Sequence, residues 1–307
     1  MPRRTILSAS QRAAFEALPT EPEDLVRHWT LSEDDLALVR ERRRAWNRLG
    51  FAVQLCLIRY PGRALRAGEE LPAPMIDFVA EQTGGSSDDF QGYAHRDETR
   101  RGHLAFLIRH FRLSTFTGRH FRDMVRWLVP VAEENPKSVL LVGAILNELR
   151  RRRVLHPSLS VVERIVATAG VRAERQIFGR VNTHLSAAHR EMLDAWLSPT
   201  PGQPQSRFTW IRQPVGRPSP AHVMGILEKL SALHGLKLPA ALLSELSPAR
   251  QRVLTQEGMR ASASHLRELG PARRHATVSV CLLETRRSLM DDALTRCSSF
   301  LDLTSWP

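Results

Sequence analysis

Apolar side chains recur every three or four residues along most of the chain, which is the spacing of one face of an α-helix. Two stretches show this most clearly, and their apolar positions are Val39, Trp46, Leu49, Val53 and Leu57 in the first and Leu104, Leu107, Ile108 and Phe111 in the second. No stretch alternates apolar and polar residues in the way that a strand ladder requires. The pattern therefore predicts an all-α protein.

Capping and turn residues mark the ends of the predicted helices. Ser32 precedes three carboxylates, an arrangement that favours a helix start. Tyr60-Pro61-Gly62 ends the next helical stretch, since proline cannot continue a helix. Breaks at Leu113–Gly118 and at Asn135-Pro136 divide the following region into short helices. The pattern does not distinguish one long helix around Arg44 from two helices that join there.

The predicted helices group into tandem small domains of the helix-turn-helix type. We expect a first helical DNA-binding domain over residues 1–92 and a second over 93–200. Residues 201–219 are rich in proline and glycine and are predicted to be a linker, with RFTWIRQ as a short ordered segment. Residues 220–307 are expected to form an incomplete third domain with an atypical tail, because TRCSSFLDLTSWP shows little helical periodicity.

The charge of the chain is unusual. Its 307 residues include 44 Lys and Arg against 32 Asp and Glu, which gives a net charge of +12. A balance this basic is typical of proteins that bind a polyanion, although an arginine-rich composition from a GC-rich genome would also produce it. The charge is also sectored: residues 1–36 hold four Arg against seven acids, and residues 37–66 hold eight Arg against one Glu. Such a change of sign within one small domain favours a docking face.

The candidate DNA contacts are the polar residues that flank the two apolar stripes. They are Arg40, Arg43, Arg44, Asn47 and Arg48 in the first domain and Arg100, Arg101, Arg109, Arg112 and Arg119 in the second. Arginine supplies phosphate contacts and reads guanine, whereas asparagine reads adenine. The run from Arg150 to Arg153 has two interpretations, because cations also favour a helix C-terminus.

No catalytic or metal-binding motif is present in the sequence. Walker A, HExxH, GxSxG and GxGxxG patterns are missing, and the three cysteines have no CxxC pair. The carboxylates Glu33, Asp34 and Asp35 are placed to start a helix rather than to hold a metal. The apolar run VLLVGAIL is too short to span a membrane, which needs about 20 residues.

Several long strings resemble one family. MPRRTILSASQRAAFEALP and LVRHWTLSEDDLALVRERRRAWNRLGFAVQLCLIRYPGR are similar to the N-terminus of transposases of the Tn-three family, which belong to replicative class II transposons. FTWIRQPVGRPSPAHVMGILEKL and LRELGPARRHATVSVCLLETRRSLMDDAL resemble later segments of the same enzymes. The resemblance covers residues 1 to about 295.

This resemblance implies an architecture and a division of labour. The full enzymes are longer and begin with helical DNA-binding domains that recognise the terminal inverted repeats of the transposon. A later RNase H-like core carries an acidic triad and Mg²⁺. No residue of this chain matches that triad, so we expect no catalytic residue and no cofactor here, with Mg²⁺ required only by the core. The resemblance also suggests truncation before the core by a frameshift or premature stop.

The sequence thus predicts a non-catalytic portion of a transposase that binds terminal inverted-repeat DNA. Its expected partners are double-stranded DNA and full-length transposase, with no membrane, in the bacterial cytoplasm at the nucleoid. The alternative is a helical interaction protein whose basic surface binds nucleic acid non-specifically or binds a protein partner.

Overall fold

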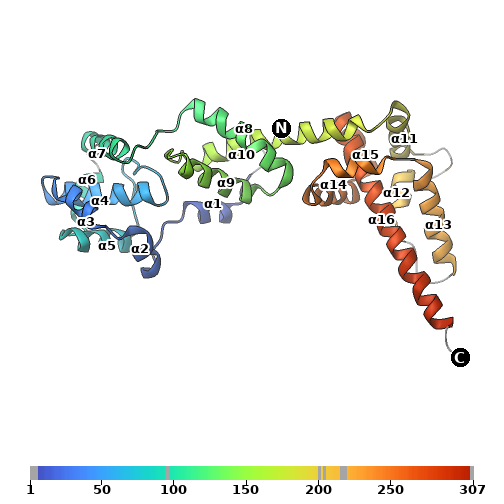
Figure 1. Cartoon of the computed structure of the whole chain (residues 1–307), viewed down its shortest axis with the longest axis horizontal. Coiled ribbons are helices and arrows are strands. Elements are labelled where there is room, and N and C mark those ends of the chain that lie inside the picture. Colours follow the sequence, from blue (N-terminus) through green and yellow to red (C-terminus); the bar gives the residue numbers. More distant parts are fainter. Residues whose placement is uncertain (1–5, 95–96, 200–201, 203–204, 215–219, 305–307) are drawn as a thin grey trace. The chain divides into compact units, whose positions relative to one another are not determined.

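The computed structural model describes residues 6–94, 97–199, 202, 205–214 and 220–304, and these residues are largely helical (Figure 1). Every regular element among them is an α-helix or a 3-10 helix, so the predicted all-α class is confirmed. Their β-type pairings are two isolated bridges, Ser114–Val154 and Pro199–Ser206. None of the described helices combines the length and the apolar character that a bilayer crossing would need.

The chain divides into two compact units. Unit 1 comprises Met1–Leu128 and Lys137–Thr168, and unit 2 comprises Val129–Pro136 and Ala169–Pro307. The helices that lie wholly in unit 1 are α1 (Ala9–Glu16), α2 (Pro22–Trp29), α3 (Glu33–Arg40), α4 (Ala45–Arg59), α5 (Ala73–Thr83), α6 (Asp89–Ala94), α7 (Asp97–His110) and α9 (Ser138–Arg151). Two helices contribute to both units, α8 (Gly118–Glu134) and α10 (Leu159–Thr183). Unit 2 also contains α11 (Ala187–Leu197), α12 (Arg207–Ile211), α13 (Pro220–Gly235), η1 (Ala240–Glu245), α14 (Pro248–Arg260), α15 (Ala263–Glu268) and α16 (Pro271–Thr304).

Helix α4 is the centre of unit 1. All residues from Leu49 to Ile58 are buried, and α2, α3, α5, α6 and α7 pack against this helix. Figure 1 shows α7 and α5 on opposite sides of α4. The helix ends at Arg59, directly before the predicted stop at Tyr60-Pro61-Gly62, and α3 begins after the predicted Ser32 cap. A helix that is apolar on all sides is buried on all sides, so only the two ends of α4 reach the surface.

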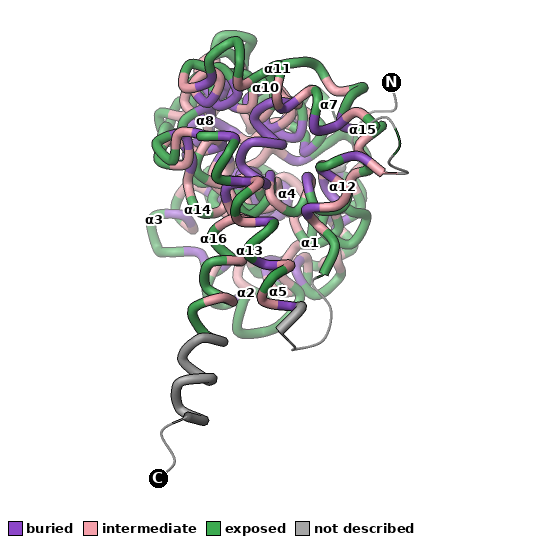
Figure 2. Tube along the Cα trace, turned by 90° about the vertical axis from the view of Figure 1, so that its right-hand side faces the viewer, coloured by how far each residue is buried: buried purple, intermediate pink, exposed green. Residues whose placement is uncertain are grey.

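Helix α16 organises unit 2. It packs against α11, α13, α14 and η1, and Cys281 lies so close to Gly258 of α14 that a side chain at Gly258 would overlap it. Beyond Leu283 no further residue is buried up to Thr295, the limit of the described side chains (Figure 2). Helix α16 continues to Thr304, through the segment whose sequence shows little helical periodicity. Extending an existing helix adds one hydrogen bond per residue, so a tail without an apolar stripe can still follow it.

The predicted domain boundaries differ from the two compact units. The boundary after residue 92 falls within unit 1, where Phe90, Tyr93 and Leu107 belong to one apolar core. The predicted linker 201–219 lies partly outside the described residues, and its middle contains α12, the expected ordered segment. Compactness does not measure independent folding, so the predicted domains stay predictions.

Substitution of Gly50 tests the packing around α4. A β-carbon at this position would lie 2.1 Å from atoms of the Tyr93 ring, and Tyr93 is fully buried. We expect Gly50→Ala to lower the free energy of unfolding by about 2–3 kcal/mol, because a tightly packed core does not accommodate an added methyl group. Urea unfolding followed by circular dichroism measures this change.

The matched control is Gly143→Ala in the interior of α9, where an added β-carbon meets nothing within 4 Å. Alanine there is expected to raise the free energy of unfolding by about 0.5–1 kcal/mol through helix propensity. Equal effects of the two substitutions would contradict the packing described for α4.

Candidate nucleic-acid interface

The first group of predicted arginines surrounds the turn between α3 and α4. Arg44 has φ 72° and ψ 140°, a conformation that no helix contains, so two helices meet here rather than one. Arg40, Arg43 and Arg44 are all exposed. The Arg44 guanidinium lies 5.2 Å from the ring centre of Trp46. Arg43 has no ion pair among the described residues and is free to meet an anion.

The other two candidates of this group are turned partly toward the protein. Arg48 is exposed, but its Nε donates a hydrogen bond to the Arg42 carbonyl at 3.0 Å. Asn47 is half-buried, and its Oδ1 is buried without a hydrogen-bond partner in the described structure. Reading adenine with Asn47 would therefore require a change of its rotamer.

Arg42 connects this turn to α7. Its guanidinium lies 4.9 Å from the ring centre of Phe51 on α4 and 4.6 Å from that of Phe106 on α7. Such cation–π contacts attract the guanidinium to both rings. Since Phe106 is one helical turn before Arg109, the structure brings the first group of arginines next to the second.

The second group lies on α7 and beyond it. Arg101 is 74% exposed and pairs with Asp97 at 3.3 Å. Arg109 and Arg112 are exposed and have no ion pair among the described residues. Arg101 and Arg109 are separated by two helical turns, so both face the solvent on the same side of α7.

Arg100, in contrast, is buried and is hydrogen-bonded within the protein. It is 8% exposed, and its Nη1 and Nη2 donate hydrogen bonds to the Leu65 carbonyl and to Asp97, each at 2.8 Å. Arg100 precedes Leu104 by four residues and Leu107 by seven, which places it on the buried side of α7. We therefore leave Arg100 out of the interface.

The first half of α8 presents a row of arginines that the predicted set contains only in part. Arg119 is 86% exposed, and Arg122 and Arg126 are also exposed at the i+3 and i+7 positions. The carboxylate of Asp123 lies 3.8 Å from both Arg119 and Arg126, which is a weak pairing. The i, i+3, i+7 spacing of Arg119, Arg122 and Arg126 is visible in the sequence and would have identified Arg122 and Arg126 as well.

The arginine run that ends α9 is partly used within the chain. Arg151 and Arg152 both donate to Glu148 at 2.6 to 2.7 Å. The Arg151 hydrogen bond, assisted by Arg152, lowers the pKa of Glu148 to about 2. Arg153 is exposed and has no ion pair in the described residues, so one member of this run remains available to a ligand.

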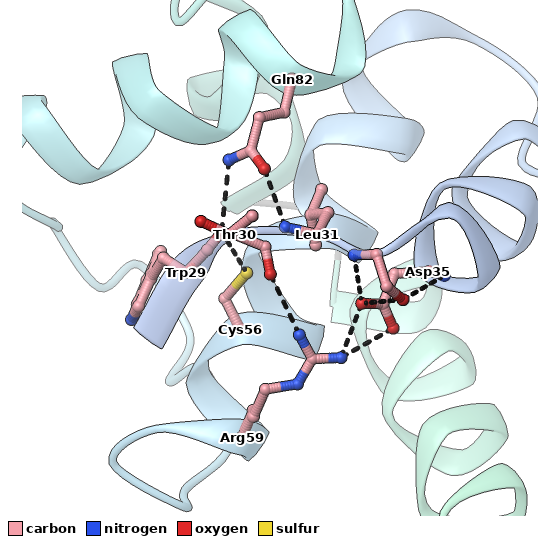
Figure 3. Close-up of polar contacts among 8 residues, drawn as sticks. Trp29, Thr30, Leu31, Asp35, Cys56, Arg59 and Gln82 are labelled. Atoms are coloured by element: carbon pink, nitrogen blue, oxygen red, sulfur yellow. Dashed lines mark hydrogen bonds and ion pairs between the residues drawn. The ribbon is translucent and has the colours of Figure 1, made fainter. Parts of the chain in front are cut away.

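A polar network fixes α3 against the end of α4 and thereby holds the turn between them (Figure 3). Arg59 Nη2 donates to both carboxylate oxygens of Asp35 at 2.7 Å, and its Nη1 donates to the Thr30 carbonyl at 3.3 Å. The backbone N–H and the hydroxyl of Ser32 each donate to Asp35 at 2.8 Å. The carboxylate thus caps α3 and binds α4 at the same time.

The adjoining segment between α2 and α3 is held in the same way. Gln82 of α5 donates from Nε2 to the Trp29 carbonyl at 3.2 Å and accepts from the Leu31 N–H at 2.8 Å (Figure 3). The Cys56 thiol also donates to the Trp29 carbonyl, and burial raises the pKa of this thiol to about 12. Cys56 is fully buried.

The exposed acids of unit 1 are spread over several helices. They include Glu23 and Asp24 on α2, Asp77 and Glu81 on α5, Glu33 and Asp34 on α3, Glu41 in the turn, and Asp97 and Glu98 on α7. The two helices α2 and α5, which pack on each other, carry one arginine, Arg27, and their side of α4 is called here the acidic side (Figure 1).

Metal ligation finds no support in the described residues. They contain no group of three or more His, Cys, Asp or Glu side chains that could hold a metal ion. Two half-buried histidines, His103 and His156, are also poor candidates for cationic contacts. Burial, together with nearby arginines, lowers the pKa of His103 and of His156 to about 4, so both are neutral at pH 7.

Comparison with known proteins shows which family this helical chain belongs to. Residues 6–169 match the family described as "Domain of unknown function (DUF4158)", and the chain belongs to that family. Over 292 residues, or 95% of its length, it is 38% identical to the transposase for transposon Tn501 of Pseudomonas aeruginosa. It is also 36% identical over 295 residues to the transposase for transposon Tn21 and 34% identical over 294 residues to that for Tn3926, both of Escherichia coli, with 96% of the chain covered.

The predicted resemblance to the N-terminal portion of Tn-three family transposases is thereby confirmed. The chain spans about 30% of the length of these curated relatives.

The Asp35–Arg59 pair provides a test of the network that holds the turn. Burial would raise the pKa of Asp35, but the hydrogen bonds from Arg59 and Ser32 outweigh it and hold the pKa below its ordinary value. A carboxylate with a depressed pKa stabilises the fold above the ordinary value, near pH 4, and this stabilisation disappears as the pH falls through the lower folded-state pKa.

We expect Asp35→Asn to lower the free energy of unfolding at pH 7 by about 2–3 kcal/mol, less than for a fully buried pair because Arg59 is 40% exposed. The difference from the wild type should shrink when urea unfolding is repeated below pH 3. Asp34→Asn, an exposed neighbour in the same turn, serves as the control. An equal effect of both substitutions would show that the pair does not hold α3 on α4.

Proposed function

We propose that this chain is the DNA-binding portion of a transposase of the Tn-three family and that it binds the terminal inverted repeats of its transposon. In this proposal it carries no strand-transfer site of its own. An RNase H-like core with Mg²⁺ supplies that chemistry in the full-length enzymes.

The observation that carries the proposal is the set of exposed arginines on one side of unit 1. Arg43, Arg109 and Arg112 are exposed without ion pairs in the described structure, in a chain that resembles transposases over 95% of its length. Other arginines of unit 1 are satisfied within the chain, as the half-buried Arg63 is by Glu69 at 2.6 Å. Arginines without such partners are available to the phosphates of DNA.

The burial of α4 limits how this surface can read DNA. A recognition helix needs one free face in the major groove, and α4 has none over Leu49–Ile58. The predicted helix-turn-helix geometry at α3 and α4 is therefore not confirmed. Helix α8 suits the role better, since Arg119, Arg122 and Arg126 are exposed on one face of its first half, where Asp123 is a weak partner of the first and the last. We propose α8 for base contacts and the α3–α4 turn and α7 for phosphate contacts.

A binding titration tests end recognition. The purified chain is titrated with a duplex that carries the terminal repeat and with a scrambled duplex, at about 50 and about 200 mM salt. We expect at least a tenfold preference for the repeat, about the discrimination of one or more good base contacts, and a steep loss of affinity at the higher salt. Arg43→Gln and Arg109→Gln should weaken binding to both duplexes alike, because phosphate contacts carry no sequence information.

The matched control is Arg27→Gln, which removes an exposed arginine of α2 on the acidic side of unit 1. It should leave both affinities nearly unchanged. Equal binding of the wild type to the two duplexes would contradict end recognition and favour the alternative, a helical protein with a non-specific basic surface. If the wild type binds neither duplex, the result favours a helical protein whose basic surface binds a protein partner.

Chelation of divalent metal tests the division between binding and chemistry. Affinity for the repeat duplex should be the same with excess EDTA and with Mg²⁺, because arginine contacts need no metal. Incubation with Mg²⁺ should leave the duplex uncut on a denaturing gel. Metal-dependent cleavage by the purified chain would overturn the proposal that it lacks a strand-transfer site.

The proposed function also has a location and a partner. It acts in the bacterial cytoplasm on nucleoid DNA, and it competes with full-length transposase for the transposon ends. Co-expression with an intact transposase should then reduce transposition, and unchanged transposition would exclude this competition.

A further inference from the structure

The non-glycine residues with positive φ share one property. In the part of the chain that the structure describes they are Arg44, Arg112, Arg153 and Lys237, and all of them are basic. Positive φ is disfavoured for residues with a β-carbon. Glycine adopts it freely, and among the other residues asparagine and aspartate adopt it most often. Long cationic side chains at all of these positions therefore need an explanation.

Arg112 ends α7 with a recurring backbone motif. Its N–H donates to the Arg109 carbonyl at 3.1 Å, and the N–H of Leu113 donates to the Ile108 carbonyl at 2.8 Å. These two bonds, with the left-handed φ of 50° at Arg112, form a Schellman motif, and Leu113 and Ile108 supply its apolar pair. Glycine is the usual residue at the left-handed position.

Arg153 ends α9 in the same way. Its N–H donates to the Arg150 carbonyl at 3.0 Å, the N–H of Val154 donates to the Leu149 carbonyl at 2.9 Å, and φ at Arg153 is 56°. Val154 and Leu149 again supply the apolar pair. Two helix ends in unit 1 thus use arginine where glycine would be the less strained choice.

The two helix ends are joined to each other. The N–H of Ser114 donates to the Arg153 carbonyl and the N–H of Leu155 donates to the Ser114 carbonyl, both at 2.9 Å. Ser114 follows Arg112 by two residues, so the bridge brings the two left-handed arginines into one small region. The N–H of His156 donates to the Gly62 carbonyl at 2.9 Å, which anchors this region to the end of α4.

Stabilisation of the helix ends does not explain these arginines. Cations near a helix C-terminus are favourable, but the last turns of α7 and α9 already contain Arg109, His110, Arg150 and Arg151. Arg112 and Arg153 are exposed and have no ion pair among the described residues.

We propose that Arg112 and Arg153 form one phosphate-binding site, called here the paired helix ends, which contacts the backbone of duplex DNA. The proposal rests on the proposed function for the choice of DNA as the polyanion. The backbone at both arginines is fixed by hydrogen bonds in the left-handed conformation. Little backbone entropy is therefore lost when the site binds a phosphate. Because the contacts are made to phosphates, the site contributes affinity and register rather than sequence preference.

Substitution by glycine separates the backbone from the charge. Arg112→Gly, Arg153→Gly and the double variant remove the cations while supplying the residue that the conformation favours. We expect thermal unfolding midpoints at or above that of the wild type. Affinity for the repeat and the scrambled duplex should fall equally, by about eightfold per arginine at about 0.1 M salt, and the slope of log K against log salt should fall by about 0.9 per arginine.

Lys237→Gly is the matched control, since Lys237 is also exposed, basic and left-handed but lies in unit 2. It should change neither affinity nor salt slope. A second pair of variants, Arg112→Lys and Arg153→Lys, retains the charge and should retain most of the affinity. A double glycine variant that binds DNA as the wild type does would overturn the proposal, as would a fall in its unfolding midpoint large enough to show that the arginines serve the fold.

The same titration distinguishes failure of this site from failure of end recognition. If the wild type does not prefer the repeat but the glycine variants still lose affinity, end recognition fails and the paired helix ends stand. If the wild type prefers the repeat and the glycine variants bind as the wild type does, end recognition stands and the paired helix ends fail. A wild type that binds neither duplex contradicts both.

Discussion

The burial of ten consecutive residues of α4 is the constraint on which the arrangement of unit 1 depends. Five helices cover α4, so the fold has no room for a charged side chain along it. The arginines of the sequence segment around α4 are therefore confined to its two ends. At the first end they form an exposed turn, and at the second Arg59 pairs with Asp35. The apolar core of unit 1 is therefore sufficient to explain where these charges lie.

The fixed turn bears on how the domain would meet a duplex in the proposed function. The Asp35–Arg59 network holds α3 on α4, and Arg42 holds the turn on α7 through Phe51 and Phe106. A rigid basic surface loses little entropy on binding, which would favour a defined register on the DNA.

Much of the secondary structure could be predicted from local sequence. The Ser32 cap and the Tyr60-Pro61-Gly62 stop act on residues next to them, so their effect is visible without a structure. The environment of a single arginine was less predictable. Arg100 is satisfied by the Leu65 carbonyl, 35 residues away in sequence, and no local pattern reveals that partner. The left-handed conformations of Arg112 and Arg153 were equally hidden, because arginine is not a residue that indicates positive φ.

Arginine-selective modification with phenylglyoxal, read by peptide mass spectrometry with and without the repeat duplex, tests the central claim most directly. The account predicts that DNA protects Arg43, Arg109, Arg112 and Arg153, while Arg27 on the acidic side reacts equally in both states. Protection of Arg27 with continued reactivity of the four others would place the DNA on the opposite side of unit 1 and contradict the account.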